Sequence, residues 1–170
     1  MRILVFCLLL LVADTSRAQQ FEIVPDAEGA IVVKGIINID WLLKHPELGK
    51  EYQGRPPGYT PDSKALQLLR EKGDSLQFVI FLGTWCGDSR FVVPRLFHLF
   101  DAAGYPKEKL TLIACDRNKK TLGNLQDAFN VKHVPTVIVM KNGKEIARVV
   151  EYGSTGLVDK ELAEQILARP

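Results

Sequence analysis

A cysteine at the expected start of a helix is the residue best suited to chemistry in this sequence. Cys86 lies within residues 84–90, which read TWCGDSR, shortly after an apolar run at 78–82. The free amide groups and the positive end of a helix that begins there would face the sulfur and favour the thiolate. The thiolate is the form of cysteine that attacks disulfide bonds. The other interpretation, a structural cysteine that fills space among apolar side chains, is disfavoured by this context.

The segments on either side of Cys86 predict a strand, a helix and a second strand. We expect the first strand at 78–82, a helix from Cys86 to about Ala103 that stops before Gly104, and the second strand at 110–114. A strand–helix–strand unit of this length makes a right-handed parallel crossover. Both strands then end at the edge of the sheet where Cys86 lies.

The C-terminal part of the chain predicts a hairpin between two helices. The expected elements are a helix at 121–129, strands at 136–140 and 145–150, a turn at Asn142-Gly143 and an amphipathic helix at 158–167. Asn-Gly accepts positive φ at both central positions of a tight turn. The four strands expected from residue 78 onward should form one mixed sheet with helices on both faces, which is an α/β fold.

Residues 19–61 predict an N-terminal extension ahead of a domain at 62–170. Within it we expect a strand at 31–37, a short helix at 39–43 and a loop rich in proline and glycine at 51–61. The next helix is expected to use Thr60 as its N-cap and Pro61 as its first residue, to bury Ala65, Leu66, Leu68 and Leu69, and to end at Gly73.

Residues 1–18 have the pattern of a secretory signal peptide. Arg2 precedes a short apolar run, and small and polar residues lead to Ala18, after which we expect cleavage. Cys7 lies inside the apolar run, so no lipid anchor is expected there. The run is shorter than the roughly 20 residues that span a bilayer, so we expect no stable membrane insertion after cleavage. The predicted destination is outside the cytoplasm, in the periplasm or secreted.

The composition excludes several function classes. The formal net charge of the whole chain is +2, which favours neither nucleic acid nor an anionic membrane as a partner. After cleavage two cysteines remain, Cys86 and Cys115, too few for a disulfide scaffold. His45, His98 and His133 have no metal-ligand spacing, so we expect neither a metal nor another cofactor.

Together these motifs resemble those of the thioredoxin superfamily over about residues 62–170. The resemblance is carried by Trp85-Cys86-Gly87, Pro94 within the following helix, Val134-Pro135-Thr136, and Lys141-Asn142-Gly143. It is most similar to extracytoplasmic thioredoxin-like proteins with an extended N-terminus. The resemblance implies that Cys86 attacks disulfides, and that Pro135 follows a cis peptide bond and packs within van der Waals reach of Cys86. It also implies that the substrate groove is formed by Trp85, Gly87, Val134 and Thr136.

Two departures from the family pattern change the expected chemistry. Ser89 occupies the position of the family's second cysteine, with Asp88 in place of its proline, and Ile80 stands where the family has a buried acid. Ser89 cannot release a mixed disulfide, but it could donate a hydrogen bond to the Cys86 thiolate, since positions i and i+3 share a helix face.

The charged neighbours of Cys86 are candidate modulators of its reactivity. Arg90 could add positive charge near the sulfur, while Asp88 would oppose it. His133, two residues before Pro135, could favour the thiolate when protonated or carry a proton, or it could be an exposed loop residue.

Three hypotheses for the function follow. In the first, Cys86 alone exchanges disulfides with protein or small-molecule thiols, and an external thiol resets it. In the second, Cys115 is the thiol that resolves the mixed disulfide. The alternative role for Cys115 is that of a small buried apolar residue. In the third, the fold is a redox-inert module that binds or chaperones other proteins.

Overall fold

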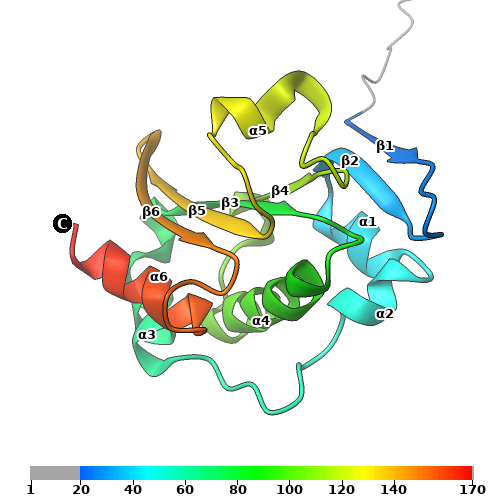
Figure 1. The fold of residues 1–170 in the computed structure, drawn as a ribbon. Helices are drawn as coiled ribbons and strands as arrows, with labels where there is room; N and C mark the ends of the chain where they lie inside the picture. Colours follow the sequence, from blue (N-terminus) through cyan, green and yellow to red (C-terminus); the bar gives the residue numbers. More distant parts are fainter. Residues whose placement is uncertain (1–19, 170) are drawn as a thin grey trace, which may run out of the picture.

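The computed structural model describes residues 20–169, which form a twisted sheet with helices on both faces (Figure 1). The predicted signal peptide at 1–18 and the first residue of the predicted extension lie outside the described residues. The short helix α5, Leu125–Ala128, covers one face of the sheet, and the other α-helices cover the opposite face. Within residues 20–169, none of the helices combines the length and apolar character needed to cross a bilayer.

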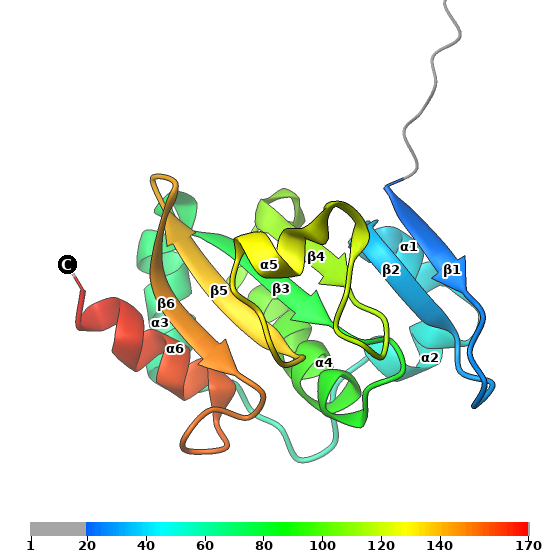
Figure 2. The ribbon, with the colours of Figure 1, turned by 45° about the horizontal axis from the view of Figure 1, so that its top comes forward.

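The sheet has six strands in the order β1-β2-β4-β3-β5-β6 (Figure 2). Their bounds are Phe21–Val24 for β1, Val32–Ile37 for β2, Gln77–Leu82 for β3, Leu110–Ala114 for β4, Thr136–Lys141 for β5 and Lys144–Val150 for β6. β3 and β4 are parallel, whereas β5 runs antiparallel to both β3 and β6. The predicted mixed sheet of four strands is therefore confirmed, and β1 and β2 extend it.

The helices are α1 at Ile39–Lys44, α2 at Leu48–Tyr52, α3 at Ser63–Lys72, α4 at Gly87–Ala103, α5 at Leu125–Ala128 and α6 at Val158–Leu167. The longest is α4, which begins directly after Cys86 and ends at Gly104, whose φ of 70° closes the helix as predicted. Pro94 lies inside α4, as expected. The hairpin turn also forms as predicted, with positive φ at Asn142 and Gly143.

The N-terminal extension is part of the same sheet. β2 pairs antiparallel with β4, and β1 pairs antiparallel with β2. Gly35 allows β1 to approach, because a Cβ there would lie 2.3 Å from the carbonyl oxygen of Gln20. Asn38 is the N-cap of α1, and its side chain accepts hydrogen bonds from two backbone amides. The sequence reasoning did not predict β1 or α2.

Two predicted helices begin or end differently in the structure. The N-cap of α3 is Asp62 rather than Thr60, since the Asp62 carboxylate accepts hydrogen bonds from the amides of Lys64 and Ala65. The helix predicted at 121–129 is reduced to α5 after a short 3-10 turn. Gly123 and Asn124 have φ values of 67° and 53°, which break an α-helix.

Apolar side chains are buried on both faces of the sheet. The larger cluster lies beneath α1, α3, α4 and α6, and the smaller one contains Phe81, Cys115 and Val134, with Trp85 and Cys86 packed against it. The smaller cluster is thus continuous with the segment around Cys86 that is predicted to be reactive.

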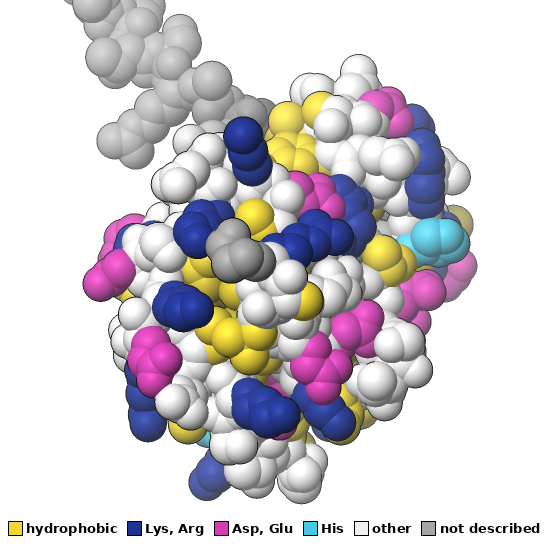
Figure 3. Space-filling model, turned by 90° about the vertical axis from the view of Figure 1, so that its left-hand side faces the viewer, with side chains coloured by type: hydrophobic (Ala, Val, Ile, Leu, Met, Phe, Trp, Pro, Cys, Tyr) yellow, Lys and Arg dark blue, Asp and Glu magenta, His cyan; other side chains and the backbone are white. Residues whose placement is uncertain are grey.

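The surface beside α6 and β6 carries interspersed charges of both signs around a group of hydrophobic side chains (Figure 3).

Candidate active site around Cys86

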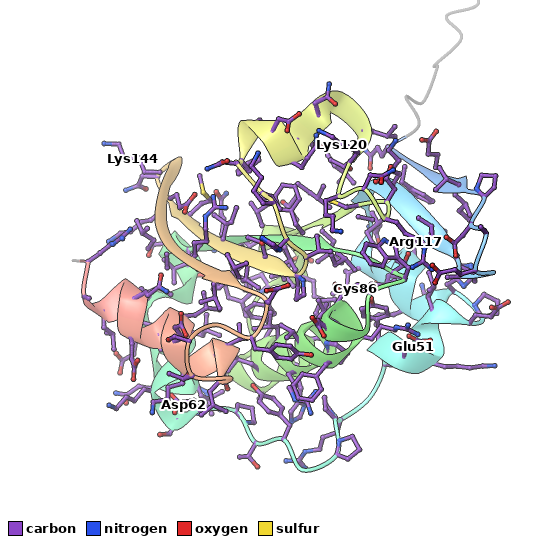
Figure 4. The ribbon with its side chains drawn as sticks, in the orientation of Figure 1. Glu51, Asp62, Cys86, Arg117, Lys120 and Lys144 are labelled. Carbon is purple, nitrogen blue, oxygen red and sulfur yellow. The ribbon has the colours of Figure 1, made fainter. Side chains whose placement is uncertain are left out.

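Cys86 is the N-cap of α4 and lies at the C-terminal edge of β3 (Figure 4). Its amide donates to the carbonyl oxygen of Gly83 at 2.9 Å, which closes the turn between strand and helix. The side chain is half-buried, and its thiol donates to the carbonyl oxygen of Val134 at 3.5 Å. The sulfur therefore lies between the positive end of α4 and the loop before β5.

The loop before β5 contains the predicted cis peptide bond between Val134 and Pro135. The hydroxyl of Thr136 donates to the carbonyl oxygen of His133 at 2.7 Å, and the amide of Glu151 donates to the carbonyl oxygen of Pro135 at 2.7 Å. The contact of Val134 with the Cys86 sulfur places this loop beside the cysteine. The prediction of a cis bond next to Cys86 is confirmed.

Ser89 has a structural partner instead of the expected catalytic one. Its side chain is fully buried, and its hydroxyl oxygen accepts a hydrogen bond from the Gly83 amide at 3.0 Å. Among residues 20–169, no hydrogen bond joins Ser89 to Cys86. Because Gly83 begins the turn that carries Cys86, Ser89 holds that turn against the first part of α4.

Trp85 is fixed from two sides. Its indole Nε1 donates to the carbonyl oxygen of Cys115 at 2.9 Å. The guanidinium of Arg117 and the ammonium of Lys119 lie 5.2 and 5.6 Å from the centre of the indole ring, within the range of cation–π attraction. Gly83 makes room for the ring, since a Cβ at that position would approach it to 2.8 Å.

The N-terminal extension supplies the carboxylate that holds Arg117. Asp26 accepts two hydrogen bonds from the guanidinium, at 2.6 and 3.0 Å, and its side chain is only 6% exposed. The hydrogen bond from Arg117 lowers the pKa of Asp26 to about 2. A bidentate pair of this kind fixes the guanidinium plane over Trp85.

A second link joins the extension to the reactive turn through Thr84. Its hydroxyl accepts from the Val33 amide at 3.1 Å and donates to the carbonyl oxygen of Ile31 at 2.6 Å. The extension therefore contacts the turn on the N-terminal side of Cys86.

Each of the two charges that flank Ser89 binds a partner other than the Cys86 sulfur. The carboxylate of Asp88 accepts a hydrogen bond from the Tyr152 hydroxyl, and this bond raises the pKa of Tyr152. The guanidinium of Arg90 forms an ion pair with Glu51 at 2.9 Å and donates to the carbonyl oxygen of Trp85 at 3.3 Å. Arg90 thus ties α2 and the reactive turn to α4.

Cys115 is fully buried at the end of β4. Its amide donates to the carbonyl oxygen of Leu82 at 2.8 Å, which continues the pairing of β4 with β3. Burial raises the pKa of its thiol to about 12. Cys86 and Cys115 are both free thiols, and Cys115 stays protonated at neutral pH, which makes it a poor nucleophile.

His133 and Ile80 complete the predicted set. The His133 side chain is 61% exposed, and its Nδ1 lies 3.9 Å from a carboxylate oxygen of Glu151. Ile80 is fully buried in the larger apolar cluster, so the acid that the family carries at this position is replaced by a hydrocarbon. Gly87 opens α4, and a Cβ there would have no neighbour within 4 Å.

The structure brings Trp85, Cys86, Gly87, Val134 and the cis-proline loop together, and their role as a substrate groove stays a prediction. Sequence reasoning missed the residues that hold them: Asp26, Glu51, Gly83, Arg117, Lys119 and Tyr152. No motif spacing relates these residues, because they come from separate elements that only the fold brings together. In the part of the chain that the structure describes, no three His, Cys, Asp or Glu side chains form a candidate metal site.

Comparison with known proteins identifies the family of this chain. The sequence profile of the thioredoxin family matches residues 64–164. Thioredoxin of Chlamydia pneumoniae is 36% identical over 92 residues, which cover 54% of this chain and 79% of that protein. Thioredoxin of Echinococcus granulosus is 34% identical over 86 residues, which cover 51% of this chain and 75% of that protein.

Solved structures include one similar protein from a plant. Thioredoxin O2 from Arabidopsis thaliana, in its oxidized state, matches with 28% identity and a TM-score of 0.40. The match covers 60% of this chain and 83% of that chain.

The sequence profile of the thioredoxin family spans more than half of the chain and includes the strand, turn and helix that carry Cys86. The chain therefore belongs to the thioredoxin family, whose members act on protein thiols and disulfides.

Proposed function

We propose that this protein exchanges disulfides through Cys86 as its single working thiol, and that an external thiol resets it. The observation that carries this proposal is the position of the three side chains that could take part in the exchange. Cys86 is half-exposed at the start of α4, whereas Ser89 is fully buried against Gly83 and Cys115 is fully buried at the end of β4.

The reaction proceeds in two exchanges. The Cys86 thiolate attacks one sulfur of a client disulfide, a new S–S bond forms between Cys86 and that sulfur, and the other client sulfur leaves as a thiolate that takes up a proton. An external thiolate then attacks the mixed disulfide at the client sulfur. Cys86 leaves as a thiolate, and the external thiol is now bonded to the client.

Neither Ser89 nor Cys115 is suited to release the client from Cys86. A serine hydroxyl stays protonated at neutral pH and forms no stable bond to sulfur, so Ser89 cannot displace the client. Cys115 is protonated because burial raises the pKa of its thiol to about 12. The mixed disulfide therefore persists until a thiol arrives from solution.

We place this activity outside the cytoplasm, in the periplasm or in secreted material. The support is the sequence of residues 1–18, with a positive start, a short apolar run and a small-residue cleavage site at Ala18. Compartments of this kind are oxidising, and client disulfides persist there.

Alkylation of the folded protein tests the proposal. The purified mature chain is treated with iodoacetamide at neutral pH, and the modified cysteine is located by peptide mass spectrometry, with Cys86→Ser as the control. We expect rapid modification of Cys86 and modification of Cys115 only after unfolding. A Cys86 that resists the reagent in the folded protein would contradict the proposal and favour a redox-inert binding module.

A further inference from the structure

A groove with a positive rim opens beside Cys86, between the α2 region and the first half of α4. It encloses about 460 Å³ and is open to solvent. Its charged lining comprises four cations, Lys50, Arg55, Arg90 and Arg95, and one carboxylate, Glu51. The groove exists because the N-terminal extension places α2 and the loop after it against α4.

The positive charges of this groove are only partly neutralised. Glu51 forms an ion pair with Arg90 at 2.9 Å, so the carboxylate is already occupied. Within residues 20–169, no carboxylate lies within 4.0 Å of the charged nitrogens of Lys50, Arg55 or Arg95. Three cations therefore face one open groove without an acidic partner.

One of these cations is held in place on the groove wall. The guanidinium carbon of Arg95 lies 3.4 Å from the centre of the Phe91 ring, and its Nη1 donates to the carbonyl oxygen of Phe91 at 2.6 Å. Pro57 and the Phe91 ring, which is 44% exposed, add apolar surface to the same lining. An occupant would therefore place apolar atoms against Pro57 and Phe91 and negative charge against the rim.

The groove is within reach of a substrate that is bonded to Cys86. Gly87 lines it and directly follows the cysteine in the chain. Glu51, from the α2 side of the groove, pairs with Arg90, which also donates to the carbonyl oxygen of Trp85, the residue before Cys86 (Figure 4). Because consecutive Cα atoms of a peptide are about 3.8 Å apart, the residues next to a client cysteine can enter the groove while that cysteine reacts.

We infer that this groove binds an extended peptide segment of a client protein in which Asp or Glu residues lie next to the reacting cysteine. The inference rests on the proposed function, because it assigns a substrate class to the same sulfur. Complementary charge across an interface raises association rates and selects partners. The groove would make Cys86 react faster with acidic disulfide segments than with neutral or basic ones.

The test compares three disulfide-linked peptides that share one length and carry two Asp, two Asn or two Lys residues next to the cysteine. The rate of mixed-disulfide formation with Cys86 is measured at low and at high ionic strength. For the wild type at low salt we expect the acidic peptide to react about tenfold faster than the basic one, and we expect the ratio to fall with added salt. Equal rates for the three peptides would overturn the inference.

The variant Lys50→Gln/Arg55→Gln removes two of the unpaired cations. Its acidic-to-neutral rate ratio should fall toward 1, whereas the matched control Lys141→Gln/Lys144→Gln should keep the wild-type ratio. The control residues flank the hairpin turn between β5 and β6. This turn lies beside the start of β3, where Gln77 pairs with Met140, whereas Cys86 follows the opposite end of β3 (Figure 4). An unchanged ratio in the groove variant, or an equal loss in the control, would also overturn the inference.

The neutral peptide separates this inference from the proposed function. If Cys86 reacts with the neutral peptide but shows no preference for acid, the exchange activity stands and the groove assignment fails. If Cys86 reacts with none of the three peptides, the proposed function fails. Each variant is judged by its own acidic-to-neutral rate ratio. A change in the reactivity of Cys86 that affects all peptides equally therefore leaves this ratio unchanged.

Discussion

The buried hydroxyl of Ser89 accepts a hydrogen bond from the amide of Gly83 at 3.0 Å. This bond joins the first turn of α4 to the start of the turn that follows β3, and Cys86 lies between the two residues in the chain. At the position of the family's second cysteine, this chain therefore has a group that stabilises the reactive turn.

Ser89→Ala tests the structural role of this hydroxyl. The substitution leaves the Gly83 amide buried without an acceptor, which should lower the free energy of unfolding by about 1–3 kcal/mol. Chemical unfolding of the wild type and the variant measures the difference. A variant of unchanged stability whose Cys86 reacts more slowly would instead assign Ser89 a direct role at the sulfur.

Gly83 and Gly87 form a matched pair for testing the packing around Trp85. A Cβ at Gly83 would lie 2.8 Å from the indole ring and 3.1 Å from the Cβ of Cys86, whereas a Cβ at Gly87 would meet nothing within 4 Å. Gly83→Ala should cost about 1–3 kcal/mol of unfolding free energy because the site is overpacked. Gly87→Ala, at the start of α4, should be neutral or stabilising by up to about 1 kcal/mol.

Unfolding and tryptophan fluorescence of the two variants check this difference. The indole emission should change in Gly83→Ala and stay near the wild-type spectrum in Gly87→Ala. Equal stability and equal spectra in the two variants would show that the Trp85 ring is free to move away from position 83.

The pair of Asp26 with Arg117 predicts a stability contribution at acid pH. Because the pKa of Asp26 is lowered from 3.8 to about 2, the contribution is fully present above pH 4 and is lost as the pH falls toward 2. Asp26→Asn should therefore be less stable than the wild type at pH 7, and the difference should shrink between pH 4 and pH 2. Denaturant unfolding at a series of pH values measures it.

Glu28→Gln is the control for that series. Glu28 also contacts Arg117, at 2.9 Å, but its side chain is 70% exposed, so its removal should change stability little. If the control loses as much stability as Asp26→Asn, the effect belongs to the net charge near Arg117 rather than to the bidentate pair.

Local sequence patterns predicted most of the fold from β3 onward, with the helix expected at 121–129 as the exception. The apolar run before Cys86, the stop at Gly104 and the Asn142-Gly143 turn each act over a few residues, and each formed as expected. Thr60 was predicted as a helix cap because it precedes a proline. The structure uses Asp62, the residue that follows this proline, to cap α3.

The partners around Cys86 could not be predicted in the same way. Asp26 and Arg117 are 91 positions apart, and Arg90 and Glu51 are 39 apart, so only the packed sheet and helices bring them together. A serine at i+3 from a cysteine indicates a shared helix face. The sequence alone does not reveal that the Ser89 hydroxyl accepts a hydrogen bond from the Gly83 amide instead of contacting Cys86.

The measurement that tests the single-thiol account most directly is mass spectrometry of four proteins after treatment with oxidised glutathione. The mature wild type should gain one stable glutathione adduct per chain, because the mixed disulfide on Cys86 has no internal thiol to release it. Cys86→Ser should gain none, and Cys115→Ser should match the wild type. Ser89→Cys should eject the adduct and close an internal disulfide with Cys86. A wild type without a lasting adduct, together with a Cys115→Ser variant that retains one, would contradict the account and identify Cys115 as the resolving thiol.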